Sequence, residues 1–282
     1  MTSLAEQDFD ALEIVVRDDG SSDATPAILD DVARRYPGRV RILKGGTNLG
    51  ITENHNALMR HCHGRYIAFF GGDDVALPGK ISSQVEWLDA DRGRLLCHHD
   101  VDVFDSATGQ HLYFYSQRHA LREGSFADLI RAPAFCAAIA VMVRRDAVPT
   151  HLHDSRLRNS SDWLLWMETL LHFGSAHRGA GIVPGVLARY RRHTNNITNQ
   201  ADLYGLEEAL LALDILLRRA PDQSRPLGVA RAERMITYGL RRALRGRPLE
   251  GARLALAGAA LSPRAVGRAI TNAIAYFGIH RA

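Results

Sequence analysis

Short apolar runs alternate with amphipathic stretches along the first ninety residues, and polar loops separate them. Runs rich in apolar and β-branched residues predict strands over 12–16, 40–43 and 65–70. Segments with apolar residues at helical spacing predict helices over 25–35 and 51–62 and from about Leu77 onward. Repeated strand–helix units of this size predict an α/β domain whose mostly parallel central sheet carries helices on both faces.

The pattern changes after Trp87 and again after Asn195. Between these points it predicts a hairpin, a buried strand, an amphipathic helix and a last strand, over 95–104 with 111–115, 137–143, 162–173 and 186–190. The remaining chain reads as helices between prolines, and five leucines there share one apolar face: Leu206, Leu210, Leu213, Leu216 and Leu217. We therefore predict an α/β domain over residues 1–198 and a helical C-terminal region over 199–282.

Composition narrows the class of protein. Hydrophobic residues make up 46% of the 282 residues and charged residues 23%, which excludes an intrinsically disordered chain. The longest uninterrupted apolar run, 134–143, has ten residues, whereas a membrane-spanning helix needs about 18. The acidic start lacks the apolar core of a secretory signal, and three widely spaced cysteines fit reduced thiols. These features predict a cytoplasmic protein.

Charge is unevenly distributed along the chain. Residues 201–282 contain thirteen arginines, no lysine and seven acidic residues, a net charge of +6, while residues 1–200 carry −2. This pattern is not typical of a nucleic-acid-binding protein, so we expect no nucleic-acid partner. Two interpretations of the basic region stay open. Its arginines are solvated on helix faces, or it rests on an anionic membrane surface, which would make the protein peripheral at the inner face of the membrane.

Paired carboxylates follow two of the predicted strands. Asp18-Asp19 comes after the first strand and Asp73-Asp74 after the third, and in open α/β sheets ligands bind where such strand ends gather. Neither loop has the glycine and lysine pattern of a phosphate cradle. Carboxylates that meet a phosphorylated ligand need a divalent cation, Mg²⁺ or Mn²⁺, between the two. The alternative is that each pair caps a helix or lies in a solvated turn.

Five segments, in order over residues 13–198, resemble the motifs of family 2 glycosyltransferases. They are Glu13–Asp23 with Asp-Asp-Gly-Ser, Asn48–Ala57, Gly64–Pro78 with Asp73-Asp74, Ser161-Asp162-Trp163 and Tyr190–Thr198. The resemblance implies the GT-A fold, a nucleotide-diphosphate-sugar donor and transfer with inversion at the anomeric carbon. It also implies a UDP- or dTDP-linked hexosyl donor and a glycan or lipid-linked acceptor, in the synthesis of a cell-surface polysaccharide or glycolipid.

The matching positions imply roles for individual residues at the donor site. Asp18 and Asp19 would contact the nucleoside base and ribose, and Asn48 and Asn54 would belong to the same substrate-binding set. Asp73 would contact the donor as well as the metal. These five side chains lie in the loops that follow the predicted strands or in the helix after them.

The resemblance also implies a metal site and a general base. Asp74, Asp73 and His193 would hold the divalent cation, with Asp74 as the main ligand; the alternative for His193 is a hydrogen-bonded loop residue. Asp162 would be the base, since an acceptor hydroxyl must lose its proton as it attacks. Trp163 beside it would supply an apolar wall to the substrate site and raise the pKa of the carboxyl. The alternative for Asp162 is a helix N-cap.

The sequence departs from the family in two places. The first acidic position of the family's Asp-x-Asp-Asp is Gly71 here, and the strand that usually precedes the Asp-Asp-Gly-Ser segment is absent, which would expose a sheet position. A truncated, non-catalytic protein that binds sugar nucleotides is therefore one alternative function. A nucleotidyltransferase that makes sugar nucleotides is another, but the sequence lacks an early glycine-rich basic loop for a triphosphate.

Overall fold

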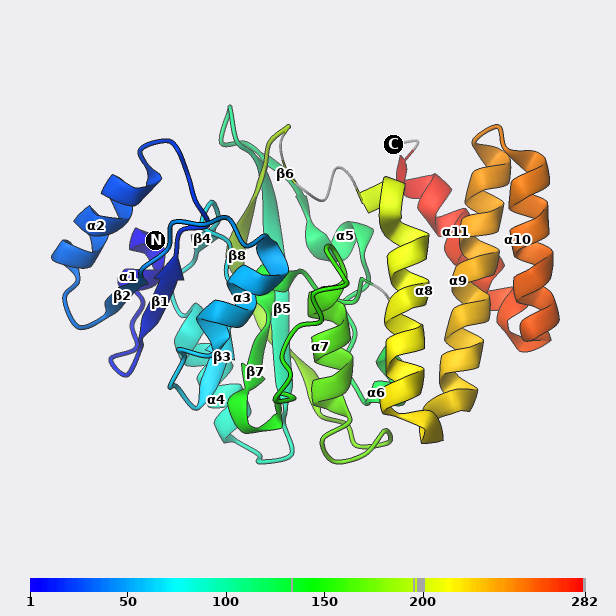
Figure 1. Ribbon diagram of the computed structural model, residues 1–282, viewed down its shortest axis with the longest axis horizontal. Coiled ribbons are helices and arrows are strands. Elements are labelled where there is room, and N and C mark those ends of the chain that lie inside the picture. The colour runs from blue at the N-terminus through cyan, green and yellow to red at the C-terminus, as the bar shows by residue number, and fades with distance from the viewer. Residues whose placement is uncertain (133, 195, 197–200, 281–282) are drawn as a thin grey trace. The chain divides into compact units, whose positions relative to one another are not determined.

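The structure, a computed structural model, describes residues 1–132, 134–194, 196 and 201–280 and divides into two units (Figure 1). The first unit comprises Met1–Phe126 with Ala134–Asn196, and the second comprises Ala127–Pro133 with Ile197–Ala282. The predicted domain boundary after residue 198, and positions 195, 197 and 198 of the last motif, lie outside the described residues. That boundary stays a prediction.

The first unit alternates strands and helices through its first half and is richer in strands in its second. Its helices are α1 (Thr2–Ala5), α2 (Thr25–Arg35), α3 (Ile51–Met59), α4 (Lys80–Asp89), α5 (Tyr115–Arg118) and α7 (Ser161–Leu170), and α6 (Phe126–Leu129) begins at its edge. Its strands are β1 (Ile14–Arg17), β2 (Val40–Leu43), β3 (Tyr66–Ala68), β4 (Val75–Ala76), β5 (Leu96–Asp105), β6 (His111–Phe114), β7 (Met142–Arg144) and β8 (Ala180–Arg192).

The strands form two sheets, and the larger one is mixed rather than mostly parallel. β1 and β2 make a parallel two-stranded sheet. The larger sheet has the order β3-β7-β5-β8-β4, with β6 on β5, and among its described pairs β5–β8 is parallel while the others are antiparallel. Strand direction was not encoded in the local pattern, because a strand buried on both faces is apolar whichever way its neighbour runs.

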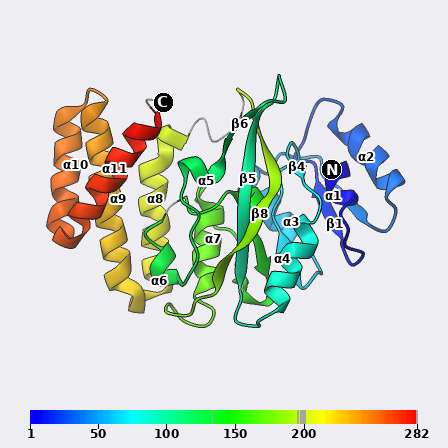
Figure 2. The same ribbon diagram turned by 180° about the vertical axis from the view of Figure 1, so that it is seen from behind.

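Helices cover both faces of the larger sheet, as predicted (Figures 1 and 2). On one face α4 packs on β5, where Ile81 and Leu88 meet Cys97. On the other face the His98 ring lies 5.6 Å from that of Phe135, which lies 5.9 Å from Trp166 of α7. Adjacent residues of β5 point to opposite faces, so this strand forms the centre of the core.

Several predicted bounds change for identifiable reasons. The predicted strand 186–190 is the end of β8, which has thirteen residues. Between the pairs His98–Ile182 and Asp100–Val186 one residue of β5 faces three of β8, a bulge that contains Pro184 and Gly185 with φ +100°. Proline and glycine interrupt the apolar pattern there and are tolerated because the ladder is already broken at a bulge. The predicted strand 137–143 is a 3₁₀ turn followed by β7.

The second unit is helical. It contains α8 (Ala201–Arg219), α9 (Ser224–Leu244), α10 (Pro248–Leu261) and α11 (Val266–His280), and α9 contacts the other three. Of the predicted leucine face, Leu213 and Leu216 are buried, whereas Leu217 is 41% exposed and lies outside it. Among the described residues, no helix combines the length and the hydropathy that crossing a membrane requires.

Candidate functional site

The loops after β1 and β2 are joined through Asp19. Its carboxylate accepts hydrogen bonds from the N–H groups of Leu49 at 2.8 Å and Gly50 at 2.9 Å and from the guanidinium of Arg17 at 2.7 Å. The same Arg17 nitrogen donates to the side-chain oxygen of Asn54 at 2.8 Å. Partial burial alone would raise the pKa of Asp19, but these donors lower it. Asp19 therefore stays ionised and fixes the shape of the two loops.

The Asp18 side chain stabilises the turn formed by residues 18–21. Its carboxylate accepts the N–H groups of Gly20 at 3.1 Å and Ser21 at 2.9 Å, and hydrogen bonds from Ser21 lower its pKa. A side chain at Gly45 would come within 2.3 Å of the Asp18 carbonyl oxygen, so the loops approach as closely as glycine allows. Asn48 lies against Gly20. The predicted donor residues of this part are thus brought together, and their contact with a nucleoside stays a prediction.

The loop after β3 meets the end of β8 through Asp73. Its Oδ2 lies 3.2 Å from Nε2 of His193, which is 120 positions away in the sequence. The guanidinium of Arg191 donates to the backbone oxygen of Asp73 at 2.7 Å. The Asp73 side chain is 46% exposed and His193 is 34% exposed. This carboxylate and this imidazole therefore face a common, solvent-accessible point.

Asp74, the next residue in the chain, is buried. The residue is 5% exposed, and its carboxylate accepts the N–H of Arg191 at 2.9 Å. Burial raises the pKa of Asp74 to about 7, although the Arg191 N–H acts in the opposite direction. A side chain at Gly71 would come within 2.6 Å of Asp74 Oδ2 and 3.0 Å of Asp73 Oδ1. The glycine that departs from the family pattern therefore leaves room for the two carboxylates that remain.

The metal-site residues fit a divalent cation as a partial ligand set. Carboxylate oxygen and imidazole nitrogen are suitable ligands for Mn²⁺, and carboxylate oxygen for Mg²⁺. Within the described ranges no three His, Cys, Asp or Glu side chains gather into a group that could hold a metal ion. A cation at Asp73 and His193 would take further ligands from its bound substrate or from water. Asp74, predicted as the main ligand, is the most buried of the three residues and already accepts a backbone hydrogen bond.

Asp162 lies in the first turn of α7. The N-cap of this helix is Ser160, so the alternative that Asp162 is the N-cap is wrong, although its carboxylate accepts the N–H of Trp163 at 2.6 Å. Trp163 itself is buried. After burial, the charge of Asp162 is among the causes that raise the pKa of the Tyr115 hydroxyl and of the Cys136 thiol. These three groups are therefore close enough to interact electrostatically.

Two connections bring the start of α7 to the other loops. Thr52, in the first turn of α3, donates to the Leu157 carbonyl at 2.7 Å and lies 3.4 Å from the Ser161 hydroxyl. Phe70 and Tyr115 pack against the same buried cluster, which links the loop after β3 to the surroundings of Asp162. The predicted residues thus gather around the ends of β1, β2, β3 and β8 and the start of α7.

Three residues of this region lie in the matched motifs but were given no role by the sequence interpretation: Arg17, Arg191 and Asn196. Arg17 and Arg191 tie loops together, as described above. The Asn196 side chain accepts the N–H of His193 at 2.6 Å and donates to the Arg191 carbonyl at 3.1 Å, which holds the turn that presents His193. The signal for Arg17 is a charged residue at the end of an apolar strand.

Comparisons with known proteins identify the family. Residues 1–149, more than half of the chain, match the sequence model described as Glycosyl transferase family 2. The chain belongs to this family. The resemblance to family 2 glycosyltransferases is therefore confirmed.

Two relatives align with two thirds or more of this chain. The protein Rv1520 of Mycobacterium tuberculosis is 31% identical over 198 residues, which cover 67% of this chain and 53% of the relative. The chain thus spans about half the length of that curated relative. EpsE of Bacillus subtilis, named a glycosyltransferase, is 25% identical over 74% of this chain and 73% of its own.

Solved structures confirm the GT-A fold. A fragment of S. aureus TarS in complex with UDP-GlcNAc aligns with a TM-score of 0.58 at 14% identity, covering 90% of this chain and 84% of that one. The mannosyltransferase PcManGT from Pyrobaculum calidifontis, in complex with GDP-Man and Mn²⁺, aligns with a TM-score of 0.54 at 17% identity, covering 98% and 79%. Because both sequence identities are below 25%, these alignments show similarity of fold and nothing about substrate.

Proposed function

We propose that this family 2 glycosyltransferase moves a hexosyl unit from a UDP- or dTDP-linked donor to a hydroxyl of a glycan or lipid-linked acceptor, with inversion and with a divalent cation. The observation that supports the proposal most directly is the pairing of Asp73 with His193, 120 positions apart in the sequence, beside the buried Asp74. The sugar nucleotides and Mn²⁺ named with the structural neighbours support it. The products would serve a cell-surface polysaccharide or glycolipid, made at the cytoplasmic face of the membrane.

In this proposal each residue has a distinct task. Asp73 and His193 would hold the cation, which supplies positive charge against the diphosphate as it leaves. Asp162 takes the proton from the acceptor hydroxyl while the hydroxyl oxygen bonds to the anomeric carbon on the face opposite the departing diphosphate. Asp19, held by Arg17, keeps the loops around the nucleoside in one shape. Asp74 supports the end of β8 through the Arg191 N–H.

Calorimetric titration with UDP, dTDP and GDP, in Mn²⁺ and in EDTA, tests the metal assignment. We expect at least about tenfold weaker binding of the preferred nucleotide in EDTA. Asp73→Asn and His193→Ala should remove this difference, since both side chains face the exposed point. Asp30→Asn, on exposed α2, is the matched control and should bind like the unchanged protein. Equal affinity in Mn²⁺ and EDTA would contradict the metal role, and a preference for GDP would contradict the donor assignment.

One observation favours the non-catalytic alternative. β1–β2 forms a sheet of its own, and among the described residues neither strand pairs with the larger sheet. A donor-binding protein without transfer activity would bind nucleotide in the titration above but release no nucleotide from a sugar nucleotide in the presence of acceptor extracts. Metal-dependent release of UDP or dTDP under the same conditions supports the enzyme.

A further inference from the structure

Helix α10 packs on α9 through its smallest residues. A side chain at Gly251 would come within 2.4 Å of the Gly239 carbonyl, and one at Gly258 within 2.9 Å of the Ala232 carbonyl. A side chain at Gly239 would meet the backbone nitrogen of Ala255 at 2.7 Å. Both glycines of α10 are buried. One face of α10 is therefore fully used by its contact with α9.

The opposite face of α10 is also apolar, but it is exposed. Leu249 is 78% exposed and Leu256 is 70% exposed, and the two lie seven positions, about two helical turns, apart. Ala252 and Ala260 are exposed on the same side. Helix periodicity places these four residues, here named the outer stripe, away from Gly251 and Gly258. A helix that is apolar on both sides is typical of one covered on both sides.

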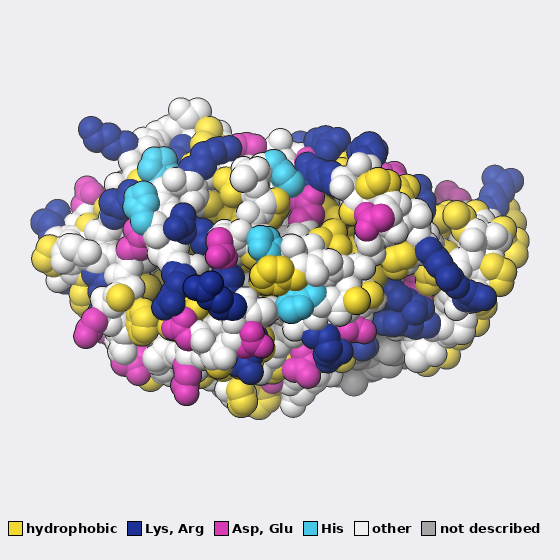
Figure 3. All heavy atoms as spheres, turned by 90° about the horizontal axis from the view of Figure 1, so that it is seen from below, with side chains coloured by type: hydrophobic (Ala, Val, Ile, Leu, Met, Phe, Trp, Pro, Cys, Tyr) yellow, Lys and Arg dark blue, Asp and Glu magenta, His cyan; other side chains and the backbone are white. Residues whose placement is uncertain are grey.

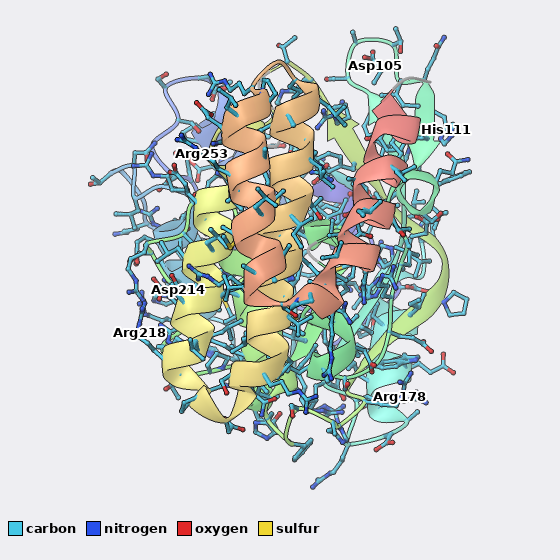
Figure 4. The ribbon with its side chains drawn as sticks, turned by 90° about the vertical axis from the view of Figure 1, so that its right-hand side faces the viewer. Asp105, His111, Arg178, Asp214, Arg218 and Arg253 are labelled. Atoms are coloured by element: carbon cyan, nitrogen blue, oxygen red, sulfur yellow. The ribbon has the colours of Figure 1, made fainter. Side chains whose placement is uncertain are left out.

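Positive charge accompanies the outer stripe. Residues 241–280 contain seven arginines and one acidic residue, Glu250, a net charge of +6, whereas residues 201–240 carry −1. Arg253 projects from α10 itself, as Figure 4 shows, and Arg264 follows the helix. Within the described part of the chain, neither of these two arginines makes an ion pair or a hydrogen bond through its side chain. In the space-filling view of Figure 3, yellow apolar and dark blue basic spheres lie beside one another toward the right-hand edge.

Charge decides which occupant fits this surface. A second copy of the chain would bring a second net charge of +6 from residues 241–280 opposite the first, and like charges repel. An anionic lipid surface provides both things that the face requires, because its headgroups attract the arginines and its acyl boundary accepts the leucines. A helix of fourteen residues, about 21 Å long, lies flat in such an interface.

We propose that the outer stripe of α10, with Arg253 and Arg264, docks the protein on an anionic lipid surface. Leu249 and Leu256 enter the boundary between headgroups and acyl chains, and the two arginines contact lipid phosphates. The close packing of α10 on α9 keeps the helix formed before it binds, so no conformational entropy is lost by ordering the helix at the lipid surface. This inference is independent of the donor, the metal and the chemistry of transfer.

Co-sedimentation of the full chain with vesicles tests the proposal. Vesicles of phosphatidylcholine alone are compared with vesicles that contain phosphatidylglycerol, at low ionic strength and at about 0.15 M salt, where the Debye length is about 8 Å. We expect binding to the anionic vesicles, weaker at the higher salt, and little binding to neutral ones.

Two double variants separate the two contributions. Arg253→Gln with Arg264→Gln should weaken binding about 25-fold, since each basic residue near an anionic surface contributes a factor of about five. Leu249→Gln with Leu256→Gln should weaken it at least about tenfold at either salt concentration, because the leucine contribution is hydrophobic. The matched control, Leu217→Gln with Arg218→Gln, changes the same residue types on α8 and should bind normally. All these positions are exposed or partly exposed, so melting temperatures should stay unchanged.

Three results would overturn the proposal. The first is no binding to anionic vesicles at low salt. The second is equal binding by the leucine double variant and the unchanged protein. The third is a dimer, seen by analytical ultracentrifugation without lipid, that the leucine double variant abolishes, since the stripe would then be covered by a second copy.

Discussion

Individual residues of the site differ in how far the sequence could predict them. Asp73 and His193 were predicted as partners, and they lie 3.2 Å apart. The role of Asp74 as the main metal ligand stays a prediction, and nothing in the sequence indicated that its carboxylate is buried and accepts the N–H of Arg191, 117 positions away. Arg17 and Asn196 were given no role, since a positioning residue is recognised by its tertiary contacts. The residue types and their order in the motifs predict the chemistry of the site. Which of these side chains are exposed depends on tertiary contacts, which the sequence does not show.

Asp162 provides the prediction that separates catalysis from binding. Asp162→Asn keeps an oxygen that can accept the Trp163 N–H, and Ser160 remains the N-cap, so the melting temperature should stay near that of the unchanged protein. The rate of transfer should fall by about 10²–10⁴ because the acceptor hydroxyl loses its base. Donor affinity, measured by titration, should change little. Asp146→Asn, the same change at an exposed helix start, is the control, and full activity of Asp162→Asn would contradict the base assignment.

At the scale of elements, strands that are regular and short were predicted best. β2 has the predicted bounds, 40–43, because its apolar residues lie between the breaks at Pro37-Gly38 and Gly45-Gly46. β8 was predicted at less than half its length because the bulge at Pro184-Gly185 breaks the pattern, and β4, with two residues, is too short to give one. Pairing and direction were the least predictable features, since β3 pairs with β7, more than seventy positions away.

The loop between β3 and β4 yields a prediction with a built-in control. Gly71→Ala introduces a side chain within 2.6 Å of Asp74 Oδ2, so both carboxylates must shift and Mn²⁺-dependent nucleotide binding should weaken by about tenfold or more. Gly72→Ala meets nothing within 4 Å and should bind normally. Titration with Mn²⁺ and UDP measures both. Gly71→Asp, which restores the family's residue, should fail like Gly71→Ala; improved binding by Gly71→Asp would show that this arrangement of the loop is wrong.

At the scale of the whole molecule, the sequence predicted an α/β domain followed by helices, and the structure adds a segment that the sequence could not assign. Residues 127–133 belong to the helical unit although they lie within the α/β part of the sequence. Arg131 pairs with Glu233 of α9, and Arg234 donates to the Ile130 carbonyl. Charged residues in a predicted helix, such as Glu233 and Arg234, are expected to face solvent. The local sequence therefore did not indicate that these two residues contact residues 127–133.

The Arg131–Glu233 pair gives a prediction for stability. Glu233 is 4% exposed, and both of its oxygens accept from the Arg131 guanidinium. Glu233→Gln should lower the free energy of unfolding by about 2 kcal/mol, because a charged double hydrogen bond becomes a single neutral one in a buried place. Glu250→Gln makes the same change where the side chain is 58% exposed, with Arg242 and Arg247 at 3.7 and 3.6 Å, and should cost less than about 0.5 kcal/mol. Urea unfolding of the full chain measures both, and equal effects of the two variants would mean that the buried pair does not hold residues 127–133 to α9.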